Sequence, residues 1–331
     1  MQKFLPMIID LNPTDYCNLS CKSCWKRNET FSKLDSRQYQ LSDEKLLSLT
    51  DEAINLGIRE FEITGGGEPL LRPVTFDLMR LIKKSRKFGS ITTNGTLFNE
   101  KLIKELVHIG WDRIIFSIDG PDKKTNDYLR GKSFDKIINN IRLFNKYKRK
   151  YKSKKPVLFF NAVIGNKNYD KLDKFIYLAK NLKIDFIKFE TLTVHSGLGR
   201  NLQLNDGQKK QLVKNSKKAF ALSKKLGINT NLDSFIDAEN INQPNKMDRL
   251  IKKKKILCRE PFYHVVVKTD GSAGPCCLFY GRAPNVKNYS LEKIWNGRYF
   301  KNIRSRIKSG KLMDYCKICN VGQVSQNAKR N

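Results

Sequence analysis

The chain has 331 residues, 40% of them hydrophobic and 10% aromatic, a composition that excludes a disordered chain and provides for one large domain and a smaller one. Its 64 lysines and arginines against 32 aspartates and glutamates give a formal net charge of +32, so its surface attracts anions. No apolar run reaches the length of a membrane span and the first residues do not form a signal peptide, so we expect a soluble, cytoplasmic protein with no membrane partner.

Short apolar runs alternate with amphipathic runs along the chain, starting with a predicted strand at residues 8–11. Residues 42–56 then have helical periodicity, with Ser42 as the N-cap and Gly57 as the stop. Further strands are predicted at residues 60–64, 90–93, 113–118, 157–164 and 186–190. Helices are predicted near residues 76–87, 99–109, 134–149 and 170–182. Six β/α units indicate an α/β protein, built as a parallel barrel or an open doubly wound sheet.

Three lysine-rich runs carry part of the positive charge, at residues 83–87, 146–155 and 252–255. Each run would suit a phosphate backbone, so a basic RNA-binding or RNA-modifying metalloprotein is an alternative function. Solvated helix faces explain the same runs without any partner. We therefore favour a small polar or anionic molecule as the partner over nucleic acid.

A cysteine triplet, Cys17, Cys21 and Cys24, follows the first predicted strand with C-x3-C-x2-C spacing. Three thiolates on one short loop leave one iron of a 4Fe-4S cube open to a small molecule. A structural zinc site would close its shell with a fourth cysteine or a histidine, and none lies in this loop. The triplet thus favours an iron-sulfur cluster over zinc.

Glycine-rich and polar turns follow the next strands. Gly65-Gly66-Gly67-Glu68-Pro69 comes after the second, and its backbone carbonyls and carboxylate suit an ammonium group. A tight strand-to-helix turn is the alternative, whereas the phosphate-binding pattern G-x4-G-K is absent. Thr93-Asn94-Gly95 and Ser117-Ile118-Asp119-Gly120 follow the third and fourth strands. In parallel α/β folds, the carboxyl ends of the strands are where sites are built.

Together these motifs resemble the radical S-adenosylmethionine (SAM) enzymes, a family whose fold is a partial (β/α)6 TIM-like barrel. The resemblance implies that the cysteine triplet holds a 4Fe-4S cluster and that the open iron binds the amino and carboxylate groups of SAM. It also implies which other residues would contact SAM, namely Gly66, Gly67, Glu68, Asn94, Ser117 and Arg130. The glycine turn would take the methionine ammonium, and Ser117 and Arg130 the carboxylate and ribose.

Four further cysteines, Cys258, Cys276, Cys316 and Cys319, complete a metal shell near the C-terminus. A structural zinc ribbon is one interpretation. The arrangement also resembles the twitch or shortened SPASM extension, which holds one auxiliary 4Fe-4S cluster, and residues 291–296 and 300–307 resemble its helices. We therefore expect a barrel over residues 1–225 and an auxiliary-cluster domain over residues 226–331. Cys277 is left as a buried bystander, an alternative ligand to Cys276, or a hydrogen-atom donor.

The resemblance also implies the reaction type. SAM would be cleaved reductively to a 5′-deoxyadenosyl radical that abstracts hydrogen from the substrate, with an electron donor such as flavodoxin or ferredoxin. Electron transfer to the auxiliary cluster would make the reaction a two-electron oxidation, a dehydrogenation. Epimerisation, with Cys277 as hydrogen donor, and ribosomal-peptide modification are alternatives.

The substrate is expected at the ends of the fifth and sixth predicted strands. Glu190 or His195 would act there as a general base, and a cap or loop hydrogen bond is the alternative for each. Asn161, Asn166 and Arg200 would help to bind a polar substrate. Because the first predicted strand begins within ten residues of Met1, we expect no leader-binding domain, which favours a small polar or sugar-like substrate.

Overall fold

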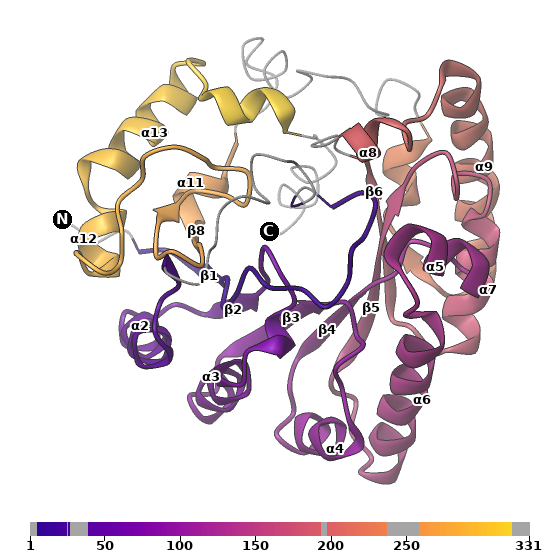
Figure 1. Cartoon of the computed structure of the whole chain (residues 1–331), viewed down its shortest axis with the longest axis horizontal. Coiled ribbons are helices and arrows are strands. Elements are labelled where there is room, and N and C mark those ends of the chain that lie inside the picture. The colour runs from indigo at the N-terminus through magenta and orange to yellow at the C-terminus, as the bar shows by residue number, and fades with distance from the viewer. Residues whose placement is uncertain (1–4, 25, 27–38, 193–196, 237–257, 320–331) are drawn as a thin grey trace. The chain divides into compact units, whose positions relative to one another are not determined.

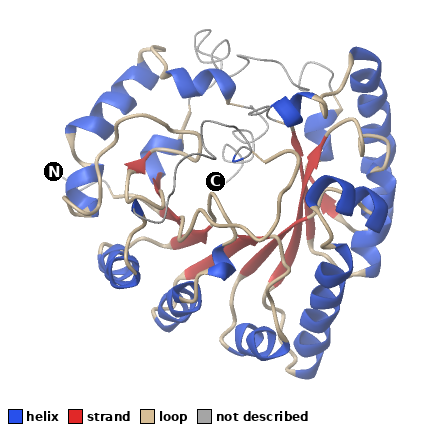
Figure 2. Cartoon of the chain, viewed as in Figure 1, coloured by secondary structure: helices blue, strands red, loops and turns tan. Residues whose placement is uncertain are grey.

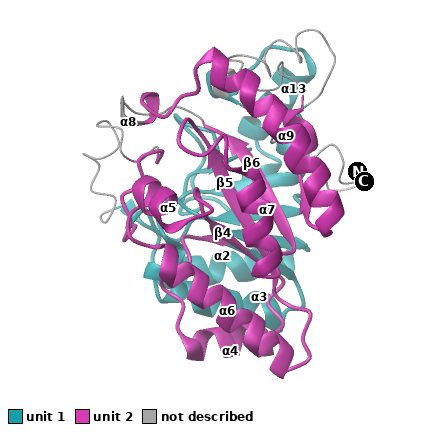
Figure 3. Ribbon diagram, turned by 90° about the vertical axis from the view of Figure 1, so that its right-hand side faces the viewer, with its two compact units in different colours: residues 1–16, 35–91, 244–331 teal, residues 17–34, 92–243 magenta. Residues whose placement is uncertain are grey.

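The computed structural model of the chain describes residues 5–24, 26, 39–192, 197–236 and 258–319 (Figure 1). The chain divides into two compact units, each assembled from separate stretches of sequence (Figure 3). Unit 1 takes residues 1–16, 35–91 and 244–331, and unit 2 takes residues 17–34 and 92–243. The C-terminal stretch therefore belongs to the same unit as the first strand, although the two are distant in sequence.

Unit 1 is built on the strands β1 (Ile8–Leu11), β2 (Glu60–Ile63), β8 (His264–Val267) and β9 (Ala273–Gly274), and on the first four residues of β3 (Phe88–Thr93). The order is β3-β2-β1-β8-β9, with all neighbours parallel except the β8–β9 hairpin. In β1 and β2 the side chains alternate: Ile9, Leu11, Phe61 and Ile63 are fully buried, whereas Asp10 and Glu62 lie on the other face.

The helices of unit 1 are α2 (Asp43–Asn55), α3 (Val74–Lys84), α11 (Glu260–Tyr263), α12 (Leu291–Trp295) and α13 (Arg298–Lys308), with the 3-10 turns η3 (Pro69–Leu71) and η6 (Asp314–Ile318). Ser42 accepts the amide N–H of Lys45 and caps α2 as predicted, and Gly57 after it has a φ of 86°. Trp295 is fully buried, and the guanidinium of Arg304 lies 4.2 Å from its ring centre. Trp295 is thus a core residue.

Unit 2 contains the parallel strands β4 (Arg113–Ser117), β5 (Val157–Ile164), β6 (Phe186–Thr191) and β7 (Asn229–Thr230). Its helices are α4 (Glu100–His108), α5 (Lys123–Arg130), α6 (Phe134–Lys150), α7 (Leu172–Asn181), α8 (Gly197–Arg200) and α9 (Asp206–Leu226), and η4 (Leu232–Phe235) is a 3-10 turn. Helices follow strands in turn, as Figure 2 shows. Every second residue of β5 is fully buried and the others are half-buried, which leaves one face of these strands partly open.

The predicted strands and helices are present, with ends shifted by up to three residues, and the expected parallel α/β fold is confirmed. Among the described elements, the helices α5, α8, α9 and α11 and the strands β7, β8 and β9 were not predicted. In α9 the signal was in the sequence, because Asn205 and Gln208 form a capping box and Gly227 ends the helix with a φ of 69°. From the segment that forms α5, only Arg130 was named beforehand, as a residue that would contact SAM. None of the described helices is long and apolar enough to cross a membrane.

Candidate active site

The cysteine triplet lies on a loop of unit 2 that is bound to the end of α5. The backbone N–H of Lys22 donates to the carbonyl of Leu129 at 2.8 Å, and the Cys21 thiol donates to the carbonyl of Arg130 at 3.7 Å. Cys17 is exposed, Cys24 is partly buried and Cys21 is buried. Burial raises the pKa of the Cys21 thiol to about 11, and the positive charge of Arg130 partly opposes this. The thiol would therefore become a thiolate through a bound metal, which deprotonates it.

Asn94 lies beside this loop. Its Nδ2 donates to Oδ1 of Asn18 at 2.8 Å and lies 3.9 Å from Sγ of Cys17. Thr96 bonds to both asparagines: its hydroxyl donates to Oδ1 of Asn94 at 2.7 Å and accepts a hydrogen bond from Nδ2 of Asn18 at 2.9 Å. Asn94, predicted to contact SAM, is thus positioned to hold the loop that carries Cys17. No role was predicted for Asn18, which lies between Cys17 and Cys21, or for Thr96, which follows the Thr93-Asn94-Gly95 turn.

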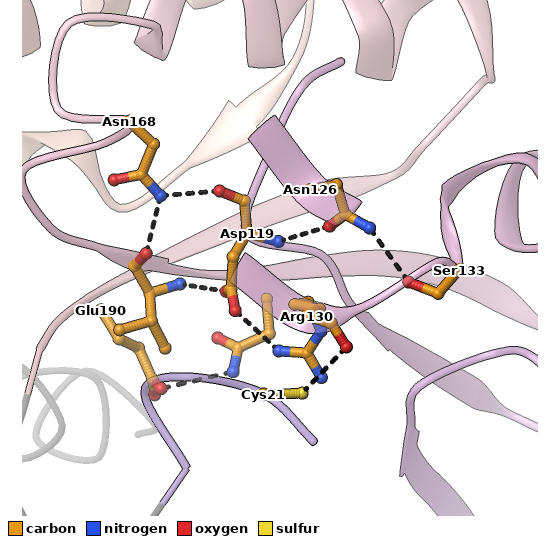
Figure 4. A network of polar contacts seen from close by, with 9 residues as sticks. Cys21, Asp119, Asn126, Arg130, Ser133, Asn168 and Glu190 are labelled. Carbon is orange, nitrogen blue, oxygen red and sulfur yellow. Dashed lines mark hydrogen bonds and ion pairs between the residues drawn. The ribbon is translucent and has the colours of Figure 1, made fainter. Parts of the chain in front are cut away.

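Arg130 forms a buried ion pair with Asp119. Its Nη1 lies 2.8 Å from Oδ2 of Asp119, and the two side chains are 13% and 2% exposed (Figure 4). Burial alone would lower the pKa of Arg130, but the negative charge of Asp119 outweighs it and raises the pKa. The Nε of Arg130 is buried and has no hydrogen-bond partner. A polar ligand would satisfy this remaining donor.

Asp119 organises the surrounding backbone. Its Oδ1 accepts the N–H of Val163 on β5 at 2.9 Å, and its own N–H donates to Asn126 on α5. Asn168 donates to the carbonyls of Asp119 and Val163 (Figure 4). A small hollow is lined by Ser23 of the cysteine loop, Asp119, Leu129, Val163, Gly165, Lys167, Asn168, Leu192 and Leu202. The Asp119 network therefore joins β4, β5 and α5 beside the loop.

Glu190 and Ser117 lie on the half-buried face of the strands in unit 2. Glu190 accepts Nδ2 of Asn161 at 3.3 Å and pairs with Lys188 at 2.6 Å. Ser117 ends β4 directly beside Asn161, whose Oδ1 is buried and has no partner.

Three further residues were predicted at these strand ends. Asn166 donates to the carbonyl of Asn201, which is the loop hydrogen bond considered as the alternative. Arg200 is exposed at the end of α8, and His195 lies outside the described residues. Glu190 thus lies on the half-buried strand face, and substrate binding by Asn166 stays a prediction.

The glycine turn belongs to unit 1. The N–H of Gly67 donates to the carbonyl of Thr14 at 3.1 Å, and the N–H of Glu68 to that of Tyr16 at 2.6 Å. A Cβ on Gly67 would lie 2.0 Å from the Tyr16 carbonyl oxygen, so only glycine fits. Glu68 is 2% exposed and accepts the N–H of Leu70 at 3.2 Å, which caps η3. The turn thus packs on the segment before the triplet, and binding of the ammonium by Gly66, Gly67 and Glu68 stays a prediction.

The four C-terminal cysteines belong to unit 1 and none is in a disulfide. Burial first, and then Glu260 and nearby thiols, raise the pKa of Cys258 and of Cys319 to about 12. Burial, followed by the neighbouring Cys277 and then by Cys258 and Cys316, raises the pKa of Cys276, so these thiols lie near one another. Cys277 is exposed, so the buried-bystander interpretation is wrong. A partly buried set of thiols, three of them with raised pKa values, is the donor chemistry expected of a metal centre.

Two sequence profiles match the chain. Residues 11–185 match the Radical SAM superfamily, and residues 258–320 match the SPASM iron-sulfur cluster-binding domain. The first match covers more than half of the chain. The chain belongs to the radical SAM superfamily. Membership of this superfamily and the SPASM match imply SAM and iron-sulfur clusters as cofactors. The donors described above fit these cofactors, since seven thiols in two groups suit iron and the buried Arg130 Nε suits a polar ligand.

Known radical SAM proteins resemble this one in part. A probable GTP 3′,8-cyclase of Sulfurisphaera tokodaii is 32% identical over 194 residues, which are 57% of this chain and 56% of that protein. The chain spans about half the length of the curated relatives it matches. SuiB of Streptococcus suis bound to SAM superposes with a TM-score of 0.71 over 99% of this chain and 75% of that one, at 18% identity. The structure of anSMEcpe with bound SAM superposes with a TM-score of 0.64 over 96% of this chain and 88% of that one, at 22% identity. These structures confirm the predicted fold.

Proposed function

We propose that this radical SAM enzyme oxidises a small polar or anionic molecule, such as a sugar derivative, by two electrons. When bound, SAM and its cluster would supply a radical that removes a hydrogen atom from a C–H bond, and an auxiliary cluster would take up the electron that remains. The observation that carries the proposal is the half-buried face of β4, β5 and β6. Near their carboxyl ends this face bears Ser117, Asn161, Lys188 and Glu190.

The half-buried face also carries Ile115, Phe159, Val163 and Phe186, and its polar groups near the strand ends contrast with the other face of the same strands. The side chains on that second face are apolar and fully buried; they belong to Phe116, Phe160, Ile187 and Phe189. An apolar substrate would remove the Lys188–Glu190 pair from water and leave the buried Oδ1 of Asn161 unsatisfied, at a cost in free energy. These groups therefore favour hydroxyl-bearing or charged substrates. The net charge of +32 favours an anionic one.

The predicted site residues have separate tasks in this proposal. Cys17, Cys21 and Cys24 would hold the SAM-binding cluster, and Gly66, Gly67, Glu68, Asn94, Ser117 and Arg130 would surround SAM. Cys258, Cys276, Cys316 and Cys319 would hold the auxiliary cluster. Glu190 would accept the hydroxyl proton of the substrate as the C–H carbon is oxidised, which completes the loss of two electrons and two protons. His195 remains a second candidate base.

The test is to incubate the anaerobically reconstituted enzyme with reductant, SAM and panels of sugar phosphates, nucleotides and short peptides, and to quantify 5′-deoxyadenosine and product. We expect 5′-deoxyadenosine above the uncoupled background with a member of the first two panels only. The Glu190→Gln variant should keep 5′-deoxyadenosine formation and lose oxidised product by about 100-fold, as expected when a general base is removed. Stimulation by peptides alone would contradict the proposed substrate class.

The RNA-modifying alternative makes a different prediction. Binding driven by phosphate contacts weakens steeply as salt rises, by about 1000-fold or more between 50 and 200 mM for six or more contacts. A labelled transfer RNA titrated at several salt concentrations would measure this slope. Tight, steeply salt-dependent binding together with RNA-dependent 5′-deoxyadenosine formation would replace the small-molecule proposal.

A further inference from the structure

Three ionisable side chains, none of them a cysteine, gather in unit 1. Asp10 of β1, Glu62 of β2 and His264 of β8 each offer one ligand atom, and these atoms lie within 4.8 Å of one another. The strand register explains the grouping, because Asp10 lies directly beside Glu62, and His264 pairs with Ile8, two residues earlier on the same face of β1. Asp10 and Glu62 lie within the strands predicted at residues 8–11 and 60–64, and no role was predicted for His264.

His264 is held so that one ring nitrogen remains available. Its Nδ1 lies 2.7 Å from Oε2 of Glu260, and the other oxygen of Glu260 accepts the hydroxyl of Tyr263 at 2.9 Å. The Nε2 of His264 is buried and has no hydrogen-bond partner. Burial lowers the pKa of His264, but the bond to Glu260 and the nearby carboxylates outweigh it and raise the pKa. In the neutral ring the carboxylate on Nδ1 holds the proton there and leaves the Nε2 lone pair for a metal ion, which is the arrangement that metal-binding histidines adopt.

Asp10 is also positioned by its neighbours. It is 4% exposed, and its Oδ1 accepts the Thr64 hydroxyl at 2.6 Å and Nδ2 of Asn12 at 3.0 Å. Both donors use the same oxygen, which orients the carboxylate. Two carboxylates side by side in a buried place repel each other, and burial followed by the charge of Glu62 raises the pKa of Asp10 to about 7. A divalent cation would relieve this repulsion.

We propose that Asp10, Glu62 and His264 bind one divalent transition-metal ion, with Glu260 orienting the histidine. One imidazole and two carboxylates suit Zn²⁺ or Mn²⁺, and they differ from the all-thiolate donors expected at the iron-sulfur centres. The ion would link β8, which lies in the SPASM-matched segment, to β1 and β2 within unit 1. Glu260 would act as a positioning residue.

The ion would be detected by titrating the chelator-treated, cluster-loaded protein with Mn²⁺ under anaerobic conditions and following free Mn²⁺ by electron paramagnetic resonance. Zinc and iron are counted separately by mass spectrometry after dialysis against Zn²⁺. We expect one saturable ion per chain beyond the cluster iron. Asp10→Asn, Glu62→Gln and His264→Gln should each abolish saturable binding, and Glu260→Gln should weaken it by about 10–100-fold. His108→Gln, at the exposed end of α4, is the matched control and should bind like the unaltered chain.

The iron content of each variant shows whether the chain still folds and carries its clusters. Absence of a saturable ion in the unaltered chain would overturn the proposal, whatever the variants do. So would unchanged binding in the His264→Gln and Asp10→Asn variants. In either case the three groups would share protons with one another instead of a metal ion.

Discussion

Replacing Asp119 by asparagine should destabilise the protein by about 3–4 kcal/mol. The carboxylate is 2% exposed and lies 2.8 Å from a guanidinium nitrogen of Arg130, which is 13% exposed. Solvent screens such a pair poorly, so removal of one charge leaves the other buried without a counter-ion, at a cost of about 3–5 kcal/mol. Asparagine keeps the shape and can still accept the N–H of Val163 through Oδ1, which places the expected value in the lower part of this range.

Urea unfolding followed by circular dichroism under anaerobic conditions measures the change in the free energy of unfolding. The matched control is Asp77→Asn, which breaks the pair with Arg80 on the surface, where both side chains are about half exposed. It should cost less than about 1 kcal/mol.

The double variant Asp119→Asn, Arg130→Met should recover much of the lost stability, because it leaves no unpaired buried charge. It should nevertheless bind SAM more weakly in equilibrium dialysis, if the Nε of Arg130 contacts the cofactor. The reasoning is refuted if Asp119→Asn costs less than about 1 kcal/mol, or if the double variant is no more stable than the single one.

Three further predictions concern single residues. Gly67→Ala places a Cβ 2.0 Å from a backbone oxygen, so it should destabilise the protein by about 1–3 kcal/mol and impair SAM binding. Urea unfolding and equilibrium dialysis measure the two effects. The control is Gly207→Ala, which should be neutral because the nearest atom to its Cβ would be 3.4 Å away. Asn94→Ala removes a donor near Cys17 Sγ, so the midpoint potential of the cluster should fall; an unchanged potential would exclude that hydrogen bond. Asp127 accepts two N–H groups at the start of α6, which lower its pKa against the opposing effect of burial. Replacement by alanine should therefore cost about 1 kcal/mol above pH 4, and the difference should vanish as the pH falls through the lowered pKa; a constant difference at acid pH would contradict this.

Much of the site could be predicted because its residues occur in short motifs. The cysteine triplet, the glycine turn and the turn at Asn94 each lie within a few residues of a strand end, and local periodicity identified those strands. The family matches confirm the interpretation of these motifs as those of a radical SAM enzyme. Asp119 shows the limit, since it stood in a recognised turn but its pairing with Arg130, eleven positions away, was not predicted.

Other parts of the molecule depended on contacts between distant segments. The predicted role of Asn94 did not include its hydrogen bonds to Asn18 and to Thr96, and Asn166 turned out to bond a loop carbonyl. Cys277 was expected to be buried in one interpretation and is exposed. Exposure of a single side chain depends on which elements pack over it, and a sequence window does not contain that information.

The sequence by itself determined the first six strands and several of the helices between them, the two groups of cysteines and the family, because these depend on the period of apolar residues and on short spacings along the chain. Only the tertiary structure decided that β8, near residue 264, pairs with β1, and thereby brought His264 to Asp10 and Glu62. Strand pairing and register join residues separated by some 250 positions, and they are set by the packing of whole faces against one another rather than by any local pattern.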